Sequence, residues 1–368
     1  MAQKKSFDFT LMITVLILVV IGIIMVFSSS QYYSFYNYNQ DSYHFLKKNL
    51  MWAGIGIVAM LFTMNFNYKG YKRIALPAYI FSIILLVLVI TPLGTNLNGA
   101  QRWISVGGIT IMPSEIAKIC GIIFVADTLT RKVKDISNFF KGIIPYLMII
   151  GLYVALILKQ PNLSTAITIA LIITSMLFVA GMRWLHIMFL GTTGVGMIIL
   201  MIIAKPYRMR RLVAFLDPFK DPKGDGYQVI QSLFALGSGG LFGVGLGRSV
   251  QNKLYIPEPQ NDFIFATIGE ELGFIGCVTV MLLFLFLIWR GIRIAIHAPD
   301  LFSSLLATGI TAMIAIQVMI NIAVATSSMP VTGIPLPFIS FGGNSLAIFM
   351  AAVGILLNIS KYTEEDLS

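Results

Sequence analysis

The residues of this chain that could do chemistry are charged side chains placed beside, or inside, long apolar stretches. Asp262 ends a polar segment and is followed at once by the apolar sequence FIFAT. A carboxylate at such an edge is a candidate for acid–base chemistry, because it can exchange a proton with a bound hydroxyl group. The alternative is an N-cap of the following helix, a position that favours Asp. Spacing alone leaves both interpretations open.

Two further pairs of ionisable residues stand inside apolar stretches, where charge is costly and therefore marks candidate functional positions. Glu115 and Lys118 are three residues apart, so on a helix they share a face and can neutralise each other. They form either a functional pair at a cavity or a structural ion pair. Glu270 and Glu271 are adjacent, so they point about 100° apart on a helix, and at most one of them can face a given cavity. Their role stays open.

Basic residues gather in the long segment 205–262. Its first part, KPYRMRRLVAFLDPF, places three arginines ahead of apolar residues, which predicts a short amphipathic helix at a membrane surface. A turn-rich stretch, a second helical stretch and a glycine-dense loop follow. The segment is either a surface loop with flexible hinges or a groove in which backbone amides and basic side chains hold an anionic head group. In the second case Arg208, Arg211 and Gln231 are candidate substrate-binding residues.

The composition indicates which elements must position these residues. Apolar and aromatic residues make up 57% of the 368 residues and charged residues 11%, against a typical charged fraction of about 25%. A water-soluble protein of this length needs more polar surface, which excludes a soluble globular enzyme, a disordered chain and a nucleic-acid-binding protein. The net charge of +10 then reports membrane topology and contact with anionic lipids. The sequence therefore predicts an integral membrane protein.

Ten apolar runs are long enough to cross a bilayer as helices, which need roughly 20 apolar residues. None shows the alternation of a β-strand, so we expect an all-α bundle of ten transmembrane helices in one polytopic domain, residues 1–368. The large loop 205–262 separates the seventh helix from the eighth. The runs are 9–29, 49–65, 74–92, 114–130, 143–158, 165–181, 187–204, 263–289, 301–326 and 340–360.

The distribution of basic residues predicts the orientation of the bundle. An even number of helices places both termini on one side, and that side collects thirteen Lys and Arg residues in the termini and short loops, against four in the short loops opposite. By the positive-inside rule both termini are cytoplasmic. The segment 205–262 is discounted, because long loops cross a membrane largely regardless of charge. The elaborated segments 93–115, 205–262 and 327–345 then lie outside, so function should face outward.

The segment 327–345, SSMPVTGIPLPFISFGGNS, contains three Pro and three Gly between two apolar runs. Such backbone cannot satisfy its own hydrogen bonds, so at membrane depth it must be buried in protein or line a water-filled cavity. It is either a re-entrant loop that shapes a cavity or a turn outside the membrane. Cys120 and Cys277 lie in apolar runs and the three His are dispersed, so the sequence offers no disulfide framework, triad or metal motif.

Several long motifs, taken in order along the chain, resemble the SEDS family of bacterial membrane proteins (shape, elongation, division and sporulation). They are GAQRWISVGGITIMPSEIAK (99–118), KQPNLSTA (159–166), GYQVIQSLFALGSGGLFGVGLG (226–247), IPEPQNDFIFATIGEELGFIG (256–276) and NIAVATSSMPVTGIPLPFISFGGNSL (321–346). The stretch around Asp262 is more similar to the FtsW and SpoVE branch than to RodA. The family often has Asp and Gly where this chain has Asn162 and Ser164, so no role is carried over to that loop.

The resemblance implies a peptidoglycan glycosyltransferase that polymerises lipid II on the outer face of the bacterial cytoplasmic membrane, with the division septum as one expected location. It implies that Asp262 is the essential acid, that Glu115 and Lys118 are a cavity pair, and that Arg102 is the outer-loop arginine at the substrate. The implied partners are lipid II, nascent glycan, a class B penicillin-binding protein and other divisome or elongasome membrane proteins. The implied cofactor is a divalent cation, Mg or Mn, with no ligands assigned.

The implied reaction joins the 4-hydroxyl of an acceptor N-acetylglucosamine to the anomeric carbon of a donor on undecaprenyl pyrophosphate. Asp262 is then the candidate base, and direct displacement predicts inversion. Arg102, Lys118, the loop arginines or the cation would stabilise the departing pyrophosphate, and Glu115 would orient Lys118 or bind the metal. The alternative is a lipid II flippase, which predicts inverted repeats that the sequence does not show. A scaffold that only recruits division proteins would leave the buried charges without a purpose.

Overall fold

The computed structural model describes residues 6–38, 40–97, 99–107, 109–224, 226–253 and 255–363. Within this part of the chain, ten helices of 16 residues or more match the ten predicted runs in order. Seven helical stretches are long and apolar enough to cross a membrane, and two shorter helices are also apolar, so the chain is an all-α multi-pass membrane protein. The ten helices are α1 (Phe9–Asn37), α2 (His44–Asn65), α3 (Tyr68–Ile90), α4 (Pro113–Lys132), α5 (Ile144–Lys159), α6 (Leu163–Val179), α7 (Trp184–Ile203), α10 (Ile264–Ile296), α11 (Leu301–Ala325) and α12 (Asn344–Ser360).

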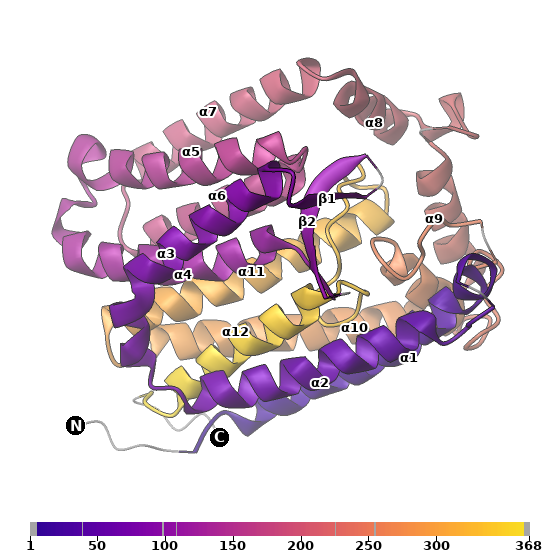
Figure 1. Cartoon of the computed structure of the whole chain (residues 1–368), viewed down its shortest axis with the longest axis horizontal. Coiled ribbons are helices and arrows are strands. Elements are labelled where there is room, and N and C mark those ends of the chain that lie inside the picture. The colour runs from indigo at the N-terminus through magenta and orange to yellow at the C-terminus, as the bar shows by residue number, and fades with distance from the viewer. Residues whose placement is uncertain are drawn as a thin grey trace.

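Burial divides these helices into a central and a peripheral set. The apolar window of α11 is 72% buried within the protein, whereas no residue of α7 is buried. In Figure 1, α10, α11 and α12 run through the middle of the bundle, α1 and α2 lie along one side, and α3 to α6 lie along the other. An apolar helix that is not buried against other helices has side chains that can contact lipid acyl chains. α7 is therefore the helix most open to the bilayer.

The first and last long helices meet at one end of the bundle. The backbone N–H of Asp8, the N-cap residue of α1, donates to Ser360 Oγ at the end of α12 (3.0 Å). The Asp8 carboxylate pairs with Arg290 near the end of α10, at 2.7 Å, and all three side chains are buried. We call this the terminal end of the bundle and the opposite one the loop end. The arrangement agrees with an even number of long helices.

The loop end carries a small antiparallel sheet that the search for apolar runs did not predict (Figure 1). Its strands are β1 (Gly94–Leu97), β2 (Ala100–Val106) and β3 (Ile109–Ile111), with β2 in the middle, Thr95 opposite Trp103 and Ile104 opposite Ile111. Strands this short give no signal in a search for spans of about 20 residues. The predicted amphipathic helix is confirmed as α8 (Pro206–Leu216), and α9 (Tyr227–Ser238) follows it. Single helical turns lie at Val133–Asp135, Phe139–Ile143 and Pro218–Lys220.

The eighth predicted run is not one continuous helix, because α10 is interrupted at Gly273, which has φ 69° and ψ −166°. The glycine-dense loop 239–247 fills the interruption. A Cβ on Gly273 would lie 2.3 Å from the Gly243 nitrogen, so this close approach requires glycine. The loop thereby replaces the hydrogen bonds that the helix loses. Four bonds of 2.9 to 3.2 Å do so: Val244 N–H to Glu270 O, Gly245 N–H to Glu271 O, Phe274 N–H to Gly240 O, and Ile275 N–H to Leu241 O.

The segment between α11 and α12 has no helix or strand, yet it lies inside the protein. Ile334, Leu336, Phe338 and Ile339 are buried. A Cβ on Gly22 would lie 2.5 Å from the carbonyl oxygen of Phe338. Gly22 is about 20 Å along α1 from its start, at a rise of about 1.5 Å per residue. The irregular backbone therefore reaches the middle of α1.

Candidate active site at the loop end

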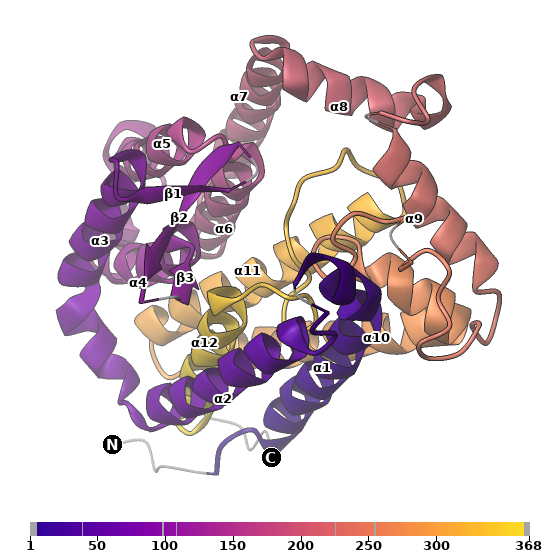
Figure 2. The ribbon, with the colours of Figure 1, turned by 45° about the vertical axis from the view of Figure 1, so that its right-hand side comes forward.

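A cavity of about 260 Å³ opens at the loop end between β2, the start of α6, the ends of α7 and α11, and α8. In Figure 2, α8 continues from the top of α7 and runs across toward α9. The cavity has a cationic part and an aliphatic part, a combination that suits an amphiphilic ligand. The cationic and aromatic lining residues are Arg102, Arg208, Arg211 and Tyr207, and the aliphatic ones include Ile167, Ile198, Ile202, Leu212 and Ile320.

Arg102 lies on β2 and is anchored to the turn between α5 and α6. Its Nε donates to the carbonyl oxygen of Gln160 at 3.2 Å, and a terminal nitrogen donates to the carbonyl of Pro161. Burial and, after it, the neighbouring Arg211 lower the pKa of Arg102. An anion in the cavity would relieve this repulsion between like charges.

α8 brings two further arginines to the cavity. Pro206 stands at its first position, where the fixed φ of Pro favours a helix start. Arg208 donates to Tyr207 Oη (2.9 Å) and to a backbone carbonyl at the end of α7 (2.9 Å), and its guanidinium lies 5.4 Å from the centre of the Tyr207 ring. Arg211 donates to the carbonyl of Val331 (3.1 Å). Since an arginine has five N–H donors, both keep donors for a ligand.

The structure contradicts the N-cap interpretation of Asp262. α10 begins at Ile264, its N-cap residue is Phe263, and no side chain caps it. The backbone carbonyl of Phe263 accepts the first helical bond, from Ala266 N–H (2.9 Å), because a turn over 261–263 delays the helix by one residue. The carboxylate of Asp262 is therefore not used to start the helix.

The surroundings of the Asp262 carboxylate give it an unusual affinity for protons. Its Oδ2 lies 3.4 Å from the position that a Cβ on Gly333 would take. Burial first, and Glu258 second, raise the pKa of Asp262 to about 6, whereas Arg211 and Arg102 act in the opposite direction. Asp262 is not among the residues that line the 260 Å³ cavity, but it interacts electrostatically with two of the predicted substrate-binding arginines that do, Arg211 and Arg102.

Glu115 and Lys118 form the predicted ion pair on α4, with 2.7 Å between Lys118 Nζ and Glu115 Oε1. Both side chains are buried. Ser345 of α12 donates to the other oxygen of Glu115 (2.8 Å), and Lys118 Nζ lies 5.5 Å from the ring centre of Phe349. These partners satisfy the pair without a substrate, as a structural ion pair requires. The pair does not line the 260 Å³ cavity, and its role at the substrate stays a prediction.

Glu270 and Glu271, whose role the sequence left open, hold the loop that precedes Asp262. Both are 1% exposed. Glu270 accepts from Ser249 Oγ (2.5 Å), whereas Glu271 accepts from Ser28 Oγ of α1 (2.6 Å) and Asn252 Nδ2 (3.4 Å). Both carboxylates therefore bind the same loop, and Glu271 also joins it to α1, whereas the prediction that at most one of them faces a given cavity stays untested.

Some cavity residues were missed in the sequence, and one candidate lies elsewhere. Tyr207, Ser164 and Thr332 line the cavity, and Ser164 Oγ donates to the Thr332 carbonyl at 3.1 Å. Residue type and spacing gave little indication of these three residues. Contacts such as the one between Ser164 and Thr332 are made to backbone carbonyls, which every residue type has. Gln231 lies half-buried on α9 and is not among the lining residues, so its binding role stays a prediction. Cys120 and Cys277 are free and buried, as expected.

Fold and site together define a class: a multi-pass α-helical membrane protein with a cationic, aliphatic-walled cavity beside a carboxylate at one end of the bundle. A family model described as "Cell cycle protein", which covers FtsW, RodA and SpoVE, matches residues 9–365. The chain belongs to this FtsW/RodA/SpoVE family, as its motifs predicted.

Individual relatives match along nearly their whole length. The chain is 48% identical over 362 residues to "Stage V sporulation protein E" of Bacillus subtilis (strain 168), covering 98% of this chain and 99% of the relative. It is 42% identical over 359 residues to the "Probable peptidoglycan glycosyltransferase FtsW" of Trichlorobacter lovleyi, covering 97% and 94%. These identities confirm the similarity to the FtsW and SpoVE branch.

Two solved structures share the fold. One, described as "Structural coordination of polymerization and crosslinking by a peptidoglycan synthase complex", aligns with a TM-score of 0.80 and 28% identity over 98% of this chain and 99% of that chain. The other is the rod shape determining protein RodA of Thermus thermophilus, with a TM-score of 0.72 and 26% identity over 98% of both chains. The bundle is therefore RodA-like over its full length.

Proposed function

We propose that this protein is a peptidoglycan glycosyltransferase that polymerises lipid II into glycan strands for cell division or sporulation. The observation that carries the proposal is the convergence of Arg102, Arg208 and Arg211 on an aliphatic-walled cavity beside Asp262. The names of the FtsW and SpoVE relatives support the same activity and the same cellular processes.

The cavity suits a donor that carries a pyrophosphate between a sugar and a polyprenyl chain. Arginine side chains bind phosphate oxygens through paired N–H groups, and three of them surround the cavity. Ile198 and Ile202 extend the aliphatic wall along α7. Because α7 is not covered by protein, a prenyl chain can continue along it into the bilayer.

Asp262 acts as the general base. It takes the proton of the acceptor 4-hydroxyl as that oxygen attacks the anomeric carbon of the donor, and the bond from this carbon to the pyrophosphate oxygen breaks. Arg102 and Arg211 hold the charge that develops on the leaving pyrophosphate. A single displacement inverts the anomeric carbon. A carboxylate with a pKa of about 6 is mostly ionised at neutral pH yet still basic enough to accept the proton.

A divalent cation, Mg or Mn, fits this site only together with substrate oxygens. Among the described residues, no group of three or more His, Cys, Asp or Glu side chains could hold a metal. Mg²⁺ commonly binds through few protein carboxylates and through substrate phosphates, so most of its ligands would come from the donor pyrophosphate. When bound, the ion would add positive charge at the leaving pyrophosphate.

We propose that all ten long helices cross the bacterial cytoplasmic membrane, with both termini in the cytoplasm, the loop end outside and the division septum as one location. The excess of Lys and Arg at the terminal end supports this orientation. The segment 327–345 then enters the membrane as a re-entrant loop, which agrees with its contact with the middle of α1.

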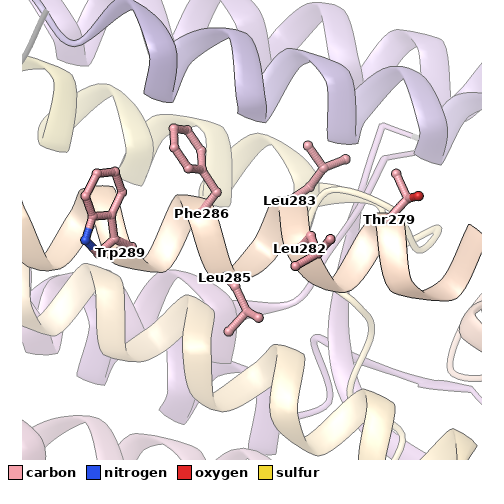
Figure 3. Close-up of a pocket in the computed structure, with 6 residues that line it drawn as sticks. All are labelled: Thr279, Leu282, Leu283, Leu285, Phe286 and Trp289. Carbon is pink, nitrogen blue, oxygen red and sulfur yellow. The ribbon is translucent and has the colours of Figure 1, made fainter. Parts of the chain in front are cut away.

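We propose a class B penicillin-binding protein as the partner, alongside other divisome or elongasome proteins. The synthase complex among the structural relatives supports such an assembly. An apolar groove on α10 offers a place for a membrane helix of this partner (Figure 3), and Leu282 and Leu285 in it are 58% and 59% exposed. The groove lies between the Gly273 interruption and Arg290, at membrane depth, so its occupant must be apolar. Its lining residues are Thr279, Leu282, Leu283, Leu285, Phe286 and Trp289.

The test is glycan polymerisation from purified lipid II in detergent with the cognate penicillin-binding protein present. Wild type is compared with Asp262→Asn, which keeps the shape but loses the base, and with Asp217→Asn, an acid at the end of α8 that is not among the groups acting on Asp262. We expect glycan from wild type and Asp217→Asn and none from folded Asp262→Asn. Equal activity of all three would show that the base lies elsewhere. Lipid II crossing liposomes without any glycan would favour the flippase.

A further inference from the structure

Four consecutive residues of the irregular segment before α12 each face a different part of the site. We call residues 331–334 the positioning strip. The carbonyls of Val331, Thr332 and Ile334 accept from Arg211 of α8 (3.1 Å), Ser164 of α6 (3.1 Å) and Asn321 of α11 (2.9 Å). Between them, a Cβ on Gly333 would lie 3.4 Å from Oδ2 of Asp262.

Asn321 is the residue that joins this strip to Asp262. Its Nδ2 donates to the backbone carbonyl of Asp262 and to that of Ile334, at 2.9 Å each. The Asn321 side chain is 1% exposed; its bond to Ile334 is buried and its bond to Asp262 is partly buried. Removing the amide would leave both carbonyls without this donor, a costly arrangement at the buried Ile334 carbonyl that favours a shift of the backbone.

Gly333 lies where the strip approaches the carboxylate. Its φ of +75° is one that residues with a Cβ rarely adopt, whereas a Cβ there would make an ordinary contact of 3.4 Å with Asp262 Oδ2. The backbone conformation of the strip, and not a lack of space, therefore favours glycine.

Asn321 holds the carbonyl of Asp262. The preceding carbonyls of Gln260 and Asn261 accept from Phe341 N–H (2.9 Å) and Ser340 Oγ (2.7 Å). The Asn321 contact reaches Asp262 itself and so fixes the backbone position from which its two side-chain torsions aim the carboxylate.

We propose that Asn321 is a positioning residue for glycosyl transfer: by tying the backbone of Asp262 to the positioning strip, it holds the catalytic carboxylate against Arg211 and Arg102. The inference rests on the proposed function, since it assumes that Asp262 is the base. Asn321 itself does not touch substrate and has no charge, so its effect passes entirely through Asp262.

The charged groups that face Asp262 are Glu258 on its own loop, Arg211 from α8 and Arg102 from β2, whereas α11 contributes the neutral Asn321. A carboxylate that moves away from the two arginines loses the interactions that favour its ionised form. The acidic limb of the rate–pH profile should then move to higher pH. A residue with a purely structural role would change the amount of folded enzyme and leave this limb in place.

The experiment compares Asn321→Leu with Gln317→Leu in the full-length protein with its partner. Gln317 lies one turn away on α11, is also 1% exposed and, in the described part of the chain, has no hydrogen-bond partner for its amide. We measure kcat, KM for lipid II, the rate–pH profile and the melting temperature in detergent. Asn321→Ser, which keeps one donor, is the milder variant.

We expect Asn321→Leu to lower kcat about tenfold to a hundredfold, to leave KM within about twofold and to move the acidic limb upward, since small misplacements of a reacting group have effects of this size. Asn321→Ser should lie between it and wild type, and Gln317→Leu should keep the wild-type kcat and limb. Wild-type kcat and limb in folded Asn321→Leu would overturn the inference alone. Loss of folding in both Asn321 variants would overturn it too, because Asn321 would then be a folding residue. Inactive wild type, or an Asp262→Asn variant as active as wild type, would refute the proposed function itself.

Discussion

Asp262 should titrate within the pH range in which the enzyme can be assayed. With a pKa of about 6, about one eleventh of the carboxyl groups is ionised at pH 5 and about ten elevenths at pH 7. Because only the ionised form accepts a proton, kcat/KM for lipid II should rise about tenfold between these values. With the ordinary value of 3.8, the rise would be less than about a tenth.

Substitution of the charged neighbours of Asp262 should shift its pKa in a direction that can be checked. Glu258 raises the pKa of Asp262, so Glu258→Gln should move the acidic limb to lower pH, whereas Arg211→Ala should move it to higher pH. Asp217→Asn is the control and should keep the wild-type limb. The assay is the initial rate of glycan formation at low lipid II concentration, with tryptophan fluorescence to show that the protein stays folded at pH 5. A flat profile from pH 5 to 7, or an upward shift in Glu258→Gln, would refute the reasoning.

Three further predictions concern the contacts that hold the bundle and the cavity together. Gly273→Ala should cost at least about 2 kcal/mol of stability, seen as a lower melting temperature, because its φ/ψ suits only glycine; Gly151→Ala in α5, where a Cβ meets nothing within 4 Å, should cost nothing. Asp8→Asn should lower the free energy of unfolding by about 3–5 kcal/mol, because Arg290 loses its buried carboxylate while the N-cap is kept. The double variant Asp8→Asn with Arg290→Met should recover stability, seen as a higher melting temperature than that of Asp8→Asn alone. Arg211→Ala should raise KM for lipid II by roughly 10-fold or more, with partial recovery in Arg211→Lys, measured by steady-state polymerisation; an unchanged KM would remove Arg211 from the binding site.

The ten helices could be predicted because the apolar residues of each segment are enough to indicate a helix there. A run such as 9–29 is apolar on every side, and in a bilayer such a run can only be a helix. The predicted ends were less accurate: α1 continues to Asn37 and α10 to Ile296, since a helix can extend beyond the hydrocarbon. The interruption at Gly273 was not predicted, because it depends on a loop that arrives from thirty residues earlier in the chain.

The candidate site residues stay predictions, and their arrangement was not predictable. Asp262 and Arg211 were proposed from residue type and position and Arg102 from the family resemblance, yet only the fold brings β2, α8 and the start of α10 together. The partners that fix them are mostly backbone carbonyls, such as those of Gln160 and Val331, and a carbonyl leaves no trace in residue type. The N-cap interpretation of Asp262 failed for a related reason, because one residue of turn geometry decides which residue caps α10.

Glu270 and Glu271 help to hold the loop that carries Asp262, the proposed base. Glu270 and Glu271 hold residues 249–252 against α10, and Asn321 holds the backbone of Asp262 against the positioning strip. The connecting stretch is thus fixed at both ends, and it contains Glu258, which tunes the proton affinity of Asp262. A site on a loop is precise only when buried contacts lock that loop. Glu270 and Glu271 place unfavourable charge in an apolar helix. Their hydrogen bonds fix the loop that leads to Asp262, and this fixed geometry is what their presence in the helix provides.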